Sequence, residues 1–265
     1  MLGNDVVDLR DPESDPESFR PRFDERVFAE EERREIAHDP RPLARRWAHW
    51  AAKEAAYKLA RRLDPGFVFS PRTLVARFDP LSEAATRGPG VVERRGRLEL
   101  PRTVGPEIST LELRSTESAA CVHVVALPGG FDWGAVDVGV ARIDPAREDA
   151  GRVARALAIT DVARSLGVAA ERLAIAKVGR VPVVELDGER TSLVLSLSHH
   201  GAWVAFACAP GPARTGRVRG EAAAERTPGV ASSGGWRPVR DGPRKDAAGG
   251  RRAAPDWRTS TGGTA

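Results

Sequence analysis

The sequence predicts an α+β protein built from two similar halves, each a helix followed by an antiparallel sheet, with a disordered tail at its C-terminus. Three observations support this fold class. Good helix formers run without Gly or Pro over residues 45–62, and a second helical run over 150–166 ends at Gly167, a favourable C-cap residue. Short runs that read as strands follow both helices. Residues 211–265 hold almost no Leu, Ile or Phe, so they bury too little apolar surface to offset chain entropy.

The first half begins with a β-like run over residues 2–9, in which Asp5, Val7 and Leu9 share one face. A charged amphipathic helix is expected over 24–38, followed by the helix over 45–62. Four strands of an antiparallel sheet come next, at "TLVARF", "GRLEL", "STLELRS" and "ACVHVVAL".

A Gly-rich stretch, "LPGGFDWG", separates the two halves. The second half holds the helix over 150–166, the strands "LAIAKV" and "VPVVEL", and one long strand, "SLVLSLSHHGAWVAFACA", interrupted at its Ser-His-His-Gly step. These boundaries predict an N-terminal half over 1–130, a C-terminal half over 131–210 and a basic tail over 211–265.

Composition excludes several classes of protein. No stretch has the length and apolarity of a membrane span, and the N-terminus lacks the pattern of a signal peptide. Cys121 and Cys208 are the only cysteines, and neither has zinc-type spacing, so a disulfide scaffold or zinc site is not expected. The positive net charge comes from the tail, because residues 211–265 contain 11 Lys/Arg and 5 Asp/Glu, a net of +6 against +4 for the whole chain. We therefore expect a cytoplasmic protein without a membrane segment.

The helix over 45–62 places charges on the face that should enter the core. Trp47, Trp50, Ala51, Glu54 and Lys58 share that face on the 3.6-residue period. An ordinary i,i+4 ion pair on a solvated surface would account for the last two residues. The two tryptophans instead favour a functional acid and base at the edge of the core.

Asp5 is a candidate metal ligand because its strand face is otherwise apolar. A buried carboxylate is costly unless it is paired, hydrogen-bonded or bound to a metal. Glu54 is the natural second carboxylate, and two carboxylates with open positions suit Mg²⁺, which completes its shell with water and phosphate oxygens. The alternative is that Asp5 caps a turn after Gly3-Asn4.

The Ser-His-His-Gly step is a candidate phosphate cradle, formed by Ser198, a histidine and backbone N–H groups. A polar strand end is the plainer interpretation. His199 and His200 are adjacent and diverge along a strand, so they should not ligate one metal together. A Ser-His hydrolase is also unfavoured, because the sequence has no G-x-S-x-G elbow at this step.

These segments together resemble a known family. "GNDVVDL", "FDERVFAEEE", "WAAKEAAYK" and "LSLSHHGAWVAFA" resemble, in order, the signature blocks of the 4′-phosphopantetheinyl transferase superfamily. The resemblance spans about residues 1–209 and implies transfer of the phosphopantetheine arm of coenzyme A to a serine of an acyl or peptidyl carrier protein, with release of 3′,5′-ADP.

The resemblance also implies roles for individual residues. Asp5 and Glu54 match the family's metal ligands, and Glu54 also matches the group that activates the serine hydroxyl, directly or through a water. Lys58 matches the lysine that contacts the pyrophosphate and steadies its developing charge. The remaining coenzyme A-binding candidates are Lys53, Arg180, Ser198 and His199, although an extra valine separates Arg180 from the proline that follows it in the family.

One departure distinguishes two branches of the family. Surfactin-type members carry an acid two residues after the metal aspartate, where this sequence has Val7; Asp8 faces the other way. The pattern is closer to the short holo-acyl-carrier-protein synthases. Those enzymes are trimers whose sites form between subunits, whereas this chain holds both blocks. We therefore expect a monomer with the active site between its halves.

The histidine directly after the serine, His199, should face that site, and His200 should lie near solvent or the outer packing. Two other functions remain open from sequence. One is a Mg²⁺-dependent nucleotide phosphodiesterase that needs no carrier protein. The other is a non-enzymatic nucleic-acid binder that uses the basic tail.

Overall fold

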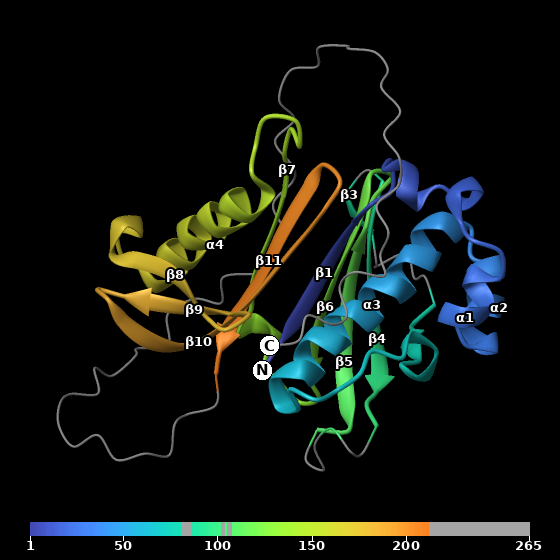
Figure 1. Cartoon of the computed structure of the whole chain (residues 1–265), viewed down its shortest axis with the longest axis horizontal. Coiled ribbons are helices and arrows are strands. Elements are labelled where there is room, and N and C mark those ends of the chain that lie inside the picture. Colours follow the sequence, from blue (N-terminus) through green and yellow to red (C-terminus); the bar gives the residue numbers. More distant parts are fainter. Residues whose placement is uncertain (81–85, 89, 102–103, 105–107, 212–265) are drawn as a thin grey trace, which may run out of the picture.

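Two antiparallel sheets lie face to face between two long helices in a computed structural model of the chain (Figure 1). The structure describes residues 1–211 except 81–85, 89, 102–103 and 105–107. The helices are α1 (Phe23–Val27), α2 (Glu30–His38), α3 (Pro42–Leu63) and α4 (Ala150–Leu166). The strands are β1 (Gly3–Asp8), β2 (Ala76–Phe78), β3 (Thr86–Gly88), β4 (Val91–Glu99), β5 (Thr110–Glu117), β6 (Cys121–Pro128), β7 (Asp137–Arg142), β8 (Leu173–Val178), β9 (Val181–Leu186), β10 (Glu189–His200) and β11 (Trp203–Pro210).

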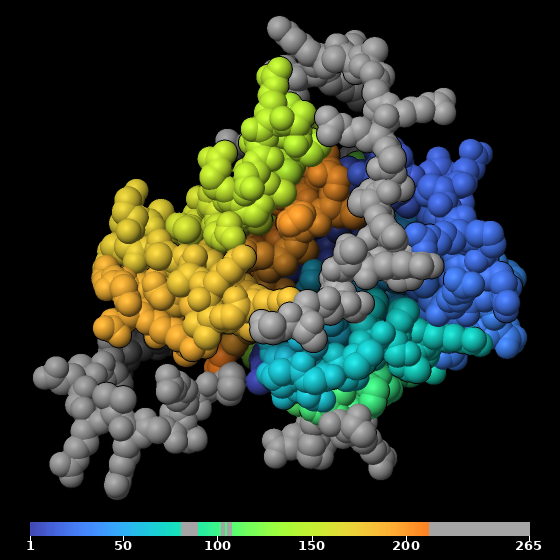
Figure 2. Space-filling model, in the orientation of Figure 1, coloured from blue at the N-terminus to red at the C-terminus, as the bar shows by residue number. Residues whose placement is uncertain are grey.

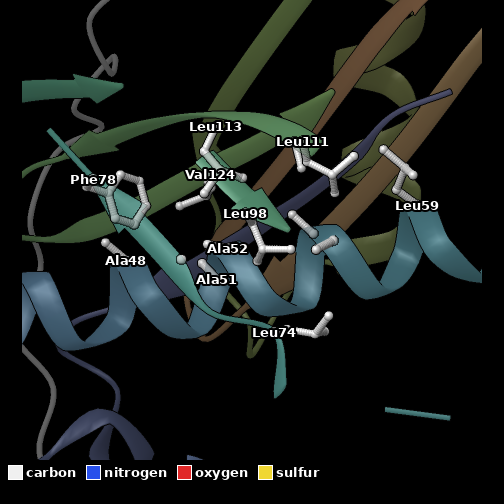
Figure 3. Packing of buried hydrophobic residues seen from close by; sticks show 14 of the residues in the cluster. Ala48, Ala51, Ala52, Leu59, Leu74, Phe78, Leu98, Leu111, Leu113 and Val124 are labelled. Carbon is white, nitrogen blue, oxygen red and sulfur yellow. The ribbon is translucent and has the colours of Figure 1, made fainter. Parts of the chain in front are cut away.

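The first sheet has the strand order β1-β6-β5-β4-β2, with β3 also paired to β4, and α3 covers one of its faces. Alanines on α3, among them Ala48, Ala51 and Ala52, let the helix lie close to the strands. Larger side chains from the strands fill the space between them, as Figure 3 shows. This small-against-large packing forms the main core of the protein.

The second sheet repeats the plan of the first. Its order is β7-β11-β10-β9-β8, and α4 covers the face that carries Leu195 and Phe206. In both halves the first strand pairs with the last, and the remaining strands follow in reverse order. The prediction of an α+β protein with two similar halves is therefore confirmed.

The two halves meet through the sheet faces that the helices leave open. Val6 of β1 packs with Trp203 and Ala205 of β11, and Leu2 packs with Val125, Leu127, Ala207 and Ala209. Figure 2 shows the second half lying along the first in this way. The contacts concentrate on β1 and β6, near one edge of the first sheet, so β1 is covered on both faces.

Three sequence expectations were wrong in detail. The helix expected over 24–38 is two helices, because Phe28 is extended and fully buried and the Glu32 carboxylate accepts a hydrogen bond from Ala29 N at 2.8 Å. The long strand over 192–209 is a hairpin of β10 and β11, turning at Gly201, whose φ is +53°. Strand β7 was not expected at all.

The predicted tail lies outside the described residues apart from Gly211. Within the described residues, no helix has the length and apolarity needed to cross a membrane.

Gly3 sets the distance between β1 and α3, which yields a test of the fold. A Cβ at this position would lie 2.0 Å from the backbone oxygen of Ala55, so the strand or the helix would have to move. We expect Gly3→Ala to lower the free energy of unfolding by about 3 kcal/mol, measured by urea denaturation. Gly129→Ala is the control, because its Cβ would lie at an ordinary 3.5 Å from the nearest atom. Equal stability of the two variants would contradict this packing.

Candidate functional site

Strand β1 and helix α3 bring Asp5, Glu54 and Lys58 together. The Lys58 ammonium group donates hydrogen bonds to Asp5 Oδ1 at 2.8 Å and to the backbone oxygen of Asn4 at 2.9 Å. Asp5 and Lys58 are partly exposed, with side-chain exposures of 14% and 30%, so the group lies at the edge of the core and within reach of solvent. The close approach at Gly3 makes these contacts possible, because it places the strand against the helix backbone.

Glu54 carries an unbalanced charge when it is ionised. Burial and the neighbouring Asp5 charge raise the pKa of Glu54 to about 7, and Lys58 offsets only part of this rise. Since Lys58 binds Asp5, the Glu54 carboxylate makes no hydrogen bond or ion pair within the described part of the chain. Two neighbouring carboxylates with one cation between them can accept a divalent metal ion or hold a proton at neutral pH.

Asn4 connects this group to the second half. Its side-chain nitrogen donates to Ser198 Oγ at 3.0 Å and lies 3.1 Å from His123 Nε2. Its backbone N–H donates to Ser196 Oγ at 3.1 Å. Asn4 is fully buried, and Ser198 is nearly so. The strand that carries Asp5 is therefore hydrogen-bonded to the strand that carries the Ser-His-His-Gly step.

Sequence reasoning missed Asn4 and His123. Burial, followed by the Lys58 charge, lowers the pKa of His123 to about 3, so this histidine is neutral in the folded protein. One signal for Asn4 was available, because it alternates with Asp5 in a strand whose other residues are mostly apolar. His123 lies in the predicted strand "ACVHVVAL", but its partner was set by tertiary packing.

The expected placement of the two histidines was wrong. His200 faces β1, where its Nδ1 accepts a hydrogen bond from Asp8 N at 3.1 Å, whereas His199 is exposed. Ser196, Ser198 and His200 share the strand face that packs on β1, and His199 lies on the opposite face with Leu195 and Leu197. The adjacent histidines point to opposite faces, as expected, but His200 and not His199 is the one that faces β1.

Asp11 and Glu13 lie near His200, and ligand atoms of the three residues fall within 4.8 Å of one another. The hydrogen bond from Asp8 N to Nδ1 fixes the histidine tautomer, since it leaves the ring proton on Nε2. A metal at Nε2 would require that proton to leave, so this tautomer suits hydrogen bonding to carboxylates better than metal ligation.

Lys53 and Arg180 are not part of this group. Lys53 is fully buried, and its ammonium group donates to Glu32 Oε2 at 2.7 Å and to the backbone oxygens of Pro71 and Leu74. These contacts attach α2 and the segment after α3 to the helix, and they leave no donor for a cofactor. Arg180 is exposed in the turn between β8 and β9. Neither the buried position of Lys53 nor the exposed turn that holds Arg180 supports the coenzyme A contacts expected of these two residues.

The second half has no acid at the position of Asp5, although burial and then the charge of Asp161 on α4 raise the pKa of Asp137 on β7. Arg142 pairs with Trp203 as Asp8 pairs with Cys121, so Gly139 takes the position that Asp5 holds in the first half. A Cβ on Gly139 would lie 2.3 Å from the Phe206 ring and 3.1 Å from an oxygen of Asp161. The repeated fold therefore carries the Asp5–Glu54 pair in its first half alone, as far as the described residues extend.

The raised pKa of Glu54 predicts a pH-dependent stability. The unfolded carboxyl ionises near pH 4.5 and the folded one near 7, so the folded state loses stability as the pH rises between these values. In the presence of a chelator, Glu54→Gln should be more stable than wild type by up to about 3 kcal/mol at pH 8. This advantage should vanish below pH 5 in urea denaturation. A difference that does not change with pH would contradict the assignment.

The placement of the two histidines predicts unequal effects on stability. His200→Ala leaves the Asp8 N–H without its acceptor and should cost about 1–2 kcal/mol of unfolding free energy. His199→Ala removes an exposed side chain and should stay within about 0.5 kcal/mol of wild type. Chemical denaturation of both variants measures the difference, and the reverse order would contradict the strand register.

Comparison with known protein families gives a match in the part of the chain that holds Asp5, Glu54 and Lys58. The family model of the 4′-phosphopantetheinyl transferase superfamily matches residues 1–87, a segment that includes Asp5, Glu54 and Lys58. A search of curated proteins found no match for the chain. Residues 1–87 are therefore similar to the 4′-phosphopantetheinyl transferase superfamily, which confirms the resemblance of the three sequence blocks in that segment; the Ser-His-His-Gly block lies outside it.

Proposed function

We propose that this chain transfers the 4′-phosphopantetheine arm of coenzyme A to a serine of an acyl or peptidyl carrier protein and releases 3′,5′-ADP. One observation carries the proposal. Within the segment that matches the family, Asp5, Glu54 and Lys58 converge at the contact between β1 and α3, and Asn4 joins that contact to Ser198. Two acids, a lysine and a hydroxyl-bearing strand suit a reaction at a pyrophosphate.

The donor set fits a divalent cation. Glu54 has no hydrogen-bond or ion-pair partner in the described part of the chain, and its charge is disfavoured by burial and by Asp5. A cation would relieve both penalties, so we assign Asp5 and Glu54 as the ligands of Mg²⁺. When bound, the ion would neutralise negative charge on the pyrophosphate of coenzyme A.

The side chains have distinct roles in the proposed transfer. The serine oxygen of the carrier attacks the phosphorus next to pantetheine, and the bond from that phosphorus to the bridging oxygen breaks, leaving 3′,5′-ADP. Glu54 accepts the serine proton, directly or through a water. Lys58, held by Asp5 and by the Asn4 carbonyl, stabilises charge on the departing phosphate.

Ser198 and His199 are proposed to hold different phosphates of coenzyme A, because their side chains leave β10 on opposite faces. Ser198 Oγ accepts from Asn4, so its own O–H is free to donate. His199 is exposed and can contact a phosphate from the solvent side. Both the acid-bearing strand and the serine-bearing strand belong to one chain, so we propose that a monomer suffices for activity.

Intact-mass analysis of apo-carrier proteins incubated with coenzyme A, Mg²⁺ and the full chain tests the function. Wild type should add phosphopantetheine to the carrier, whereas Asp5→Ala and Glu54→Gln should lose at least about 100-fold in rate, because each removes a metal ligand. Mg²⁺ should also raise the thermal midpoint of wild type at pH 8 but not that of Asp5→Ala.

Glu30→Gln, which changes an exposed glutamate on α2, is the matched control and should keep full activity. Normal modification by Asp5→Ala at limiting Mg²⁺ would refute the metal assignment. Release of free phosphopantetheine without any carrier protein would instead support a phosphodiesterase.

A further inference from the structure

The first sheet carries an arginine-lined pocket on the face that points away from α3. The second half packs on β1 and β6, and a pocket of about 380 Å³ lies beside it over β2, β4 and β5. None of the residues assigned above to transfer lines this pocket. Its lining includes Asp79, Glu112, Trp133 and four arginines, namely Arg77, Arg95, Arg97 and Arg114.

The strand register places these arginines directly opposite one another on neighbouring strands. Arg95 on β4 lies directly opposite Arg114 on β5, and Arg97 on β4 lies directly opposite Arg77 on β2. Residues directly opposite in an antiparallel pair project from the same face with Cβ atoms about 5 Å apart, and like charges at such positions are destabilising. The sheet therefore holds two repelling cation pairs side by side, although Arg97 also has Glu112 directly opposite on its other side, on β5.

Nearby groups engage only part of this positive charge. Arg77 forms an ion pair with Glu31 at 2.7 Å, and the Arg114 guanidinium lies 4.3 Å from the centre of the Trp133 ring. Glu112 accepts hydrogen bonds from Gly130 N at 2.9 Å and Trp133 Nε1 at 2.8 Å.

Two of the three arginines of β4 remain available, whereas the third, Arg94, is buried and forms ion pairs with Asp39 and Glu117. Both Arg95 and Arg97 are exposed, and neither forms a hydrogen bond or an ion pair with the described residues. Two guanidinium groups on one strand face, two residues apart, are thus available to a ligand.

We propose that this pocket binds a small molecule bearing a diphosphate group, with Arg95 and Arg97 as its main contacts. Arg95 and Arg97 together offer two positive charges without an ion-pair partner among the described residues, which matches a dianion. The guanidinium fork suits bidentate contacts to phosphate oxygens. The volume is that of a small-molecule site, and the free cations occupy two neighbouring positions, which favours a compact ligand over an extended polyanion.

Calorimetric titration with inorganic pyrophosphate, without Mg²⁺ and at constant ionic strength, tests the proposal on the full chain. A Lys58→Ala background removes the lysine proposed to bind pyrophosphate during transfer, so binding that persists there and depends on Arg95 and Arg97 belongs to a second site. Adding Arg95→Gln and Arg97→Gln should weaken this binding roughly tenfold or more. Arg190→Gln, which changes an exposed arginine on β10, is the matched control and should leave it unchanged.

The ligand-free Arg95→Gln/Arg97→Gln protein should unfold close to the wild-type midpoint, because relief of both like-charge pairs offsets the loss of the attraction between Arg97 and Glu112. Pyrophosphate binding that is absent from the Lys58→Ala protein, or insensitive to both arginine changes, would overturn the proposal. Arginine-dependent binding of poly-glutamate without binding of pyrophosphate would also overturn it, since the face would then serve an extended polyanion. These results do not depend on carrier modification.

Discussion

Strand β1 is packed on both faces, and this double packing determines where the chemistry can occur. One face meets α3 so closely at Gly3 that no side chain fits between them, and the other meets β10 and β11. Residues that alternate along the strand therefore face different partners. Asp5 projects towards Glu54 and Lys58, while Asn4 and Asp8 project towards the second half.

This arrangement couples the two halves through polar contacts as well as apolar ones. Asn4 uses its side chain, backbone N–H and backbone oxygen on Ser198, Ser196 and Lys58, respectively. Asp8 accepts from Ala202 N at 2.9 Å, and Arg62 at the end of α3 donates to the Leu195 oxygen of β10. Buried polar groups are expensive unless they are paired, so these contacts favour one relative position of the sheets.

The same placement leaves two unbalanced charge clusters on opposite sides of the first sheet. On the α3 side, Glu54 has a raised pKa because Lys58 is already committed to Asp5. On the other side, the second half covers only the edge near β1 and β6, so Arg95 and Arg97 of β4 remain open to solvent. Both clusters are electrostatically unfavourable in isolation, and both become favourable when a ligand of opposite charge binds.

Sequence alone determined the features that depend on local periodicity. The helices near 45–62 and 150–166, most of the strands, and the shared helix face of Glu54 and Lys58 follow from spacing and residue type, whereas the nearness of Asp5 to them was expected from its carboxylate chemistry and from the family resemblance. The break at Phe28 and the turn at Gly201 depend on tertiary contacts, namely the burial of Phe28 and the packing of Asp8 and Asp11 against the turn. Spacing could not predict them.

Only the tertiary structure decided which of two alternating faces looks inward. The period of a strand shows that His199 and His200 diverge, but it is equally consistent with either one facing β1. The packing of Ser196 and Ser198 against Asn4 selects His200. Lys53 is a second example of what sequence cannot predict. Its neighbours in sequence match a catalytic block, but its ammonium group is buried and donates to Glu32 and to two backbone oxygens from distant segments. Sequence determines which side chains share a face, and long-range packing determines what that face meets.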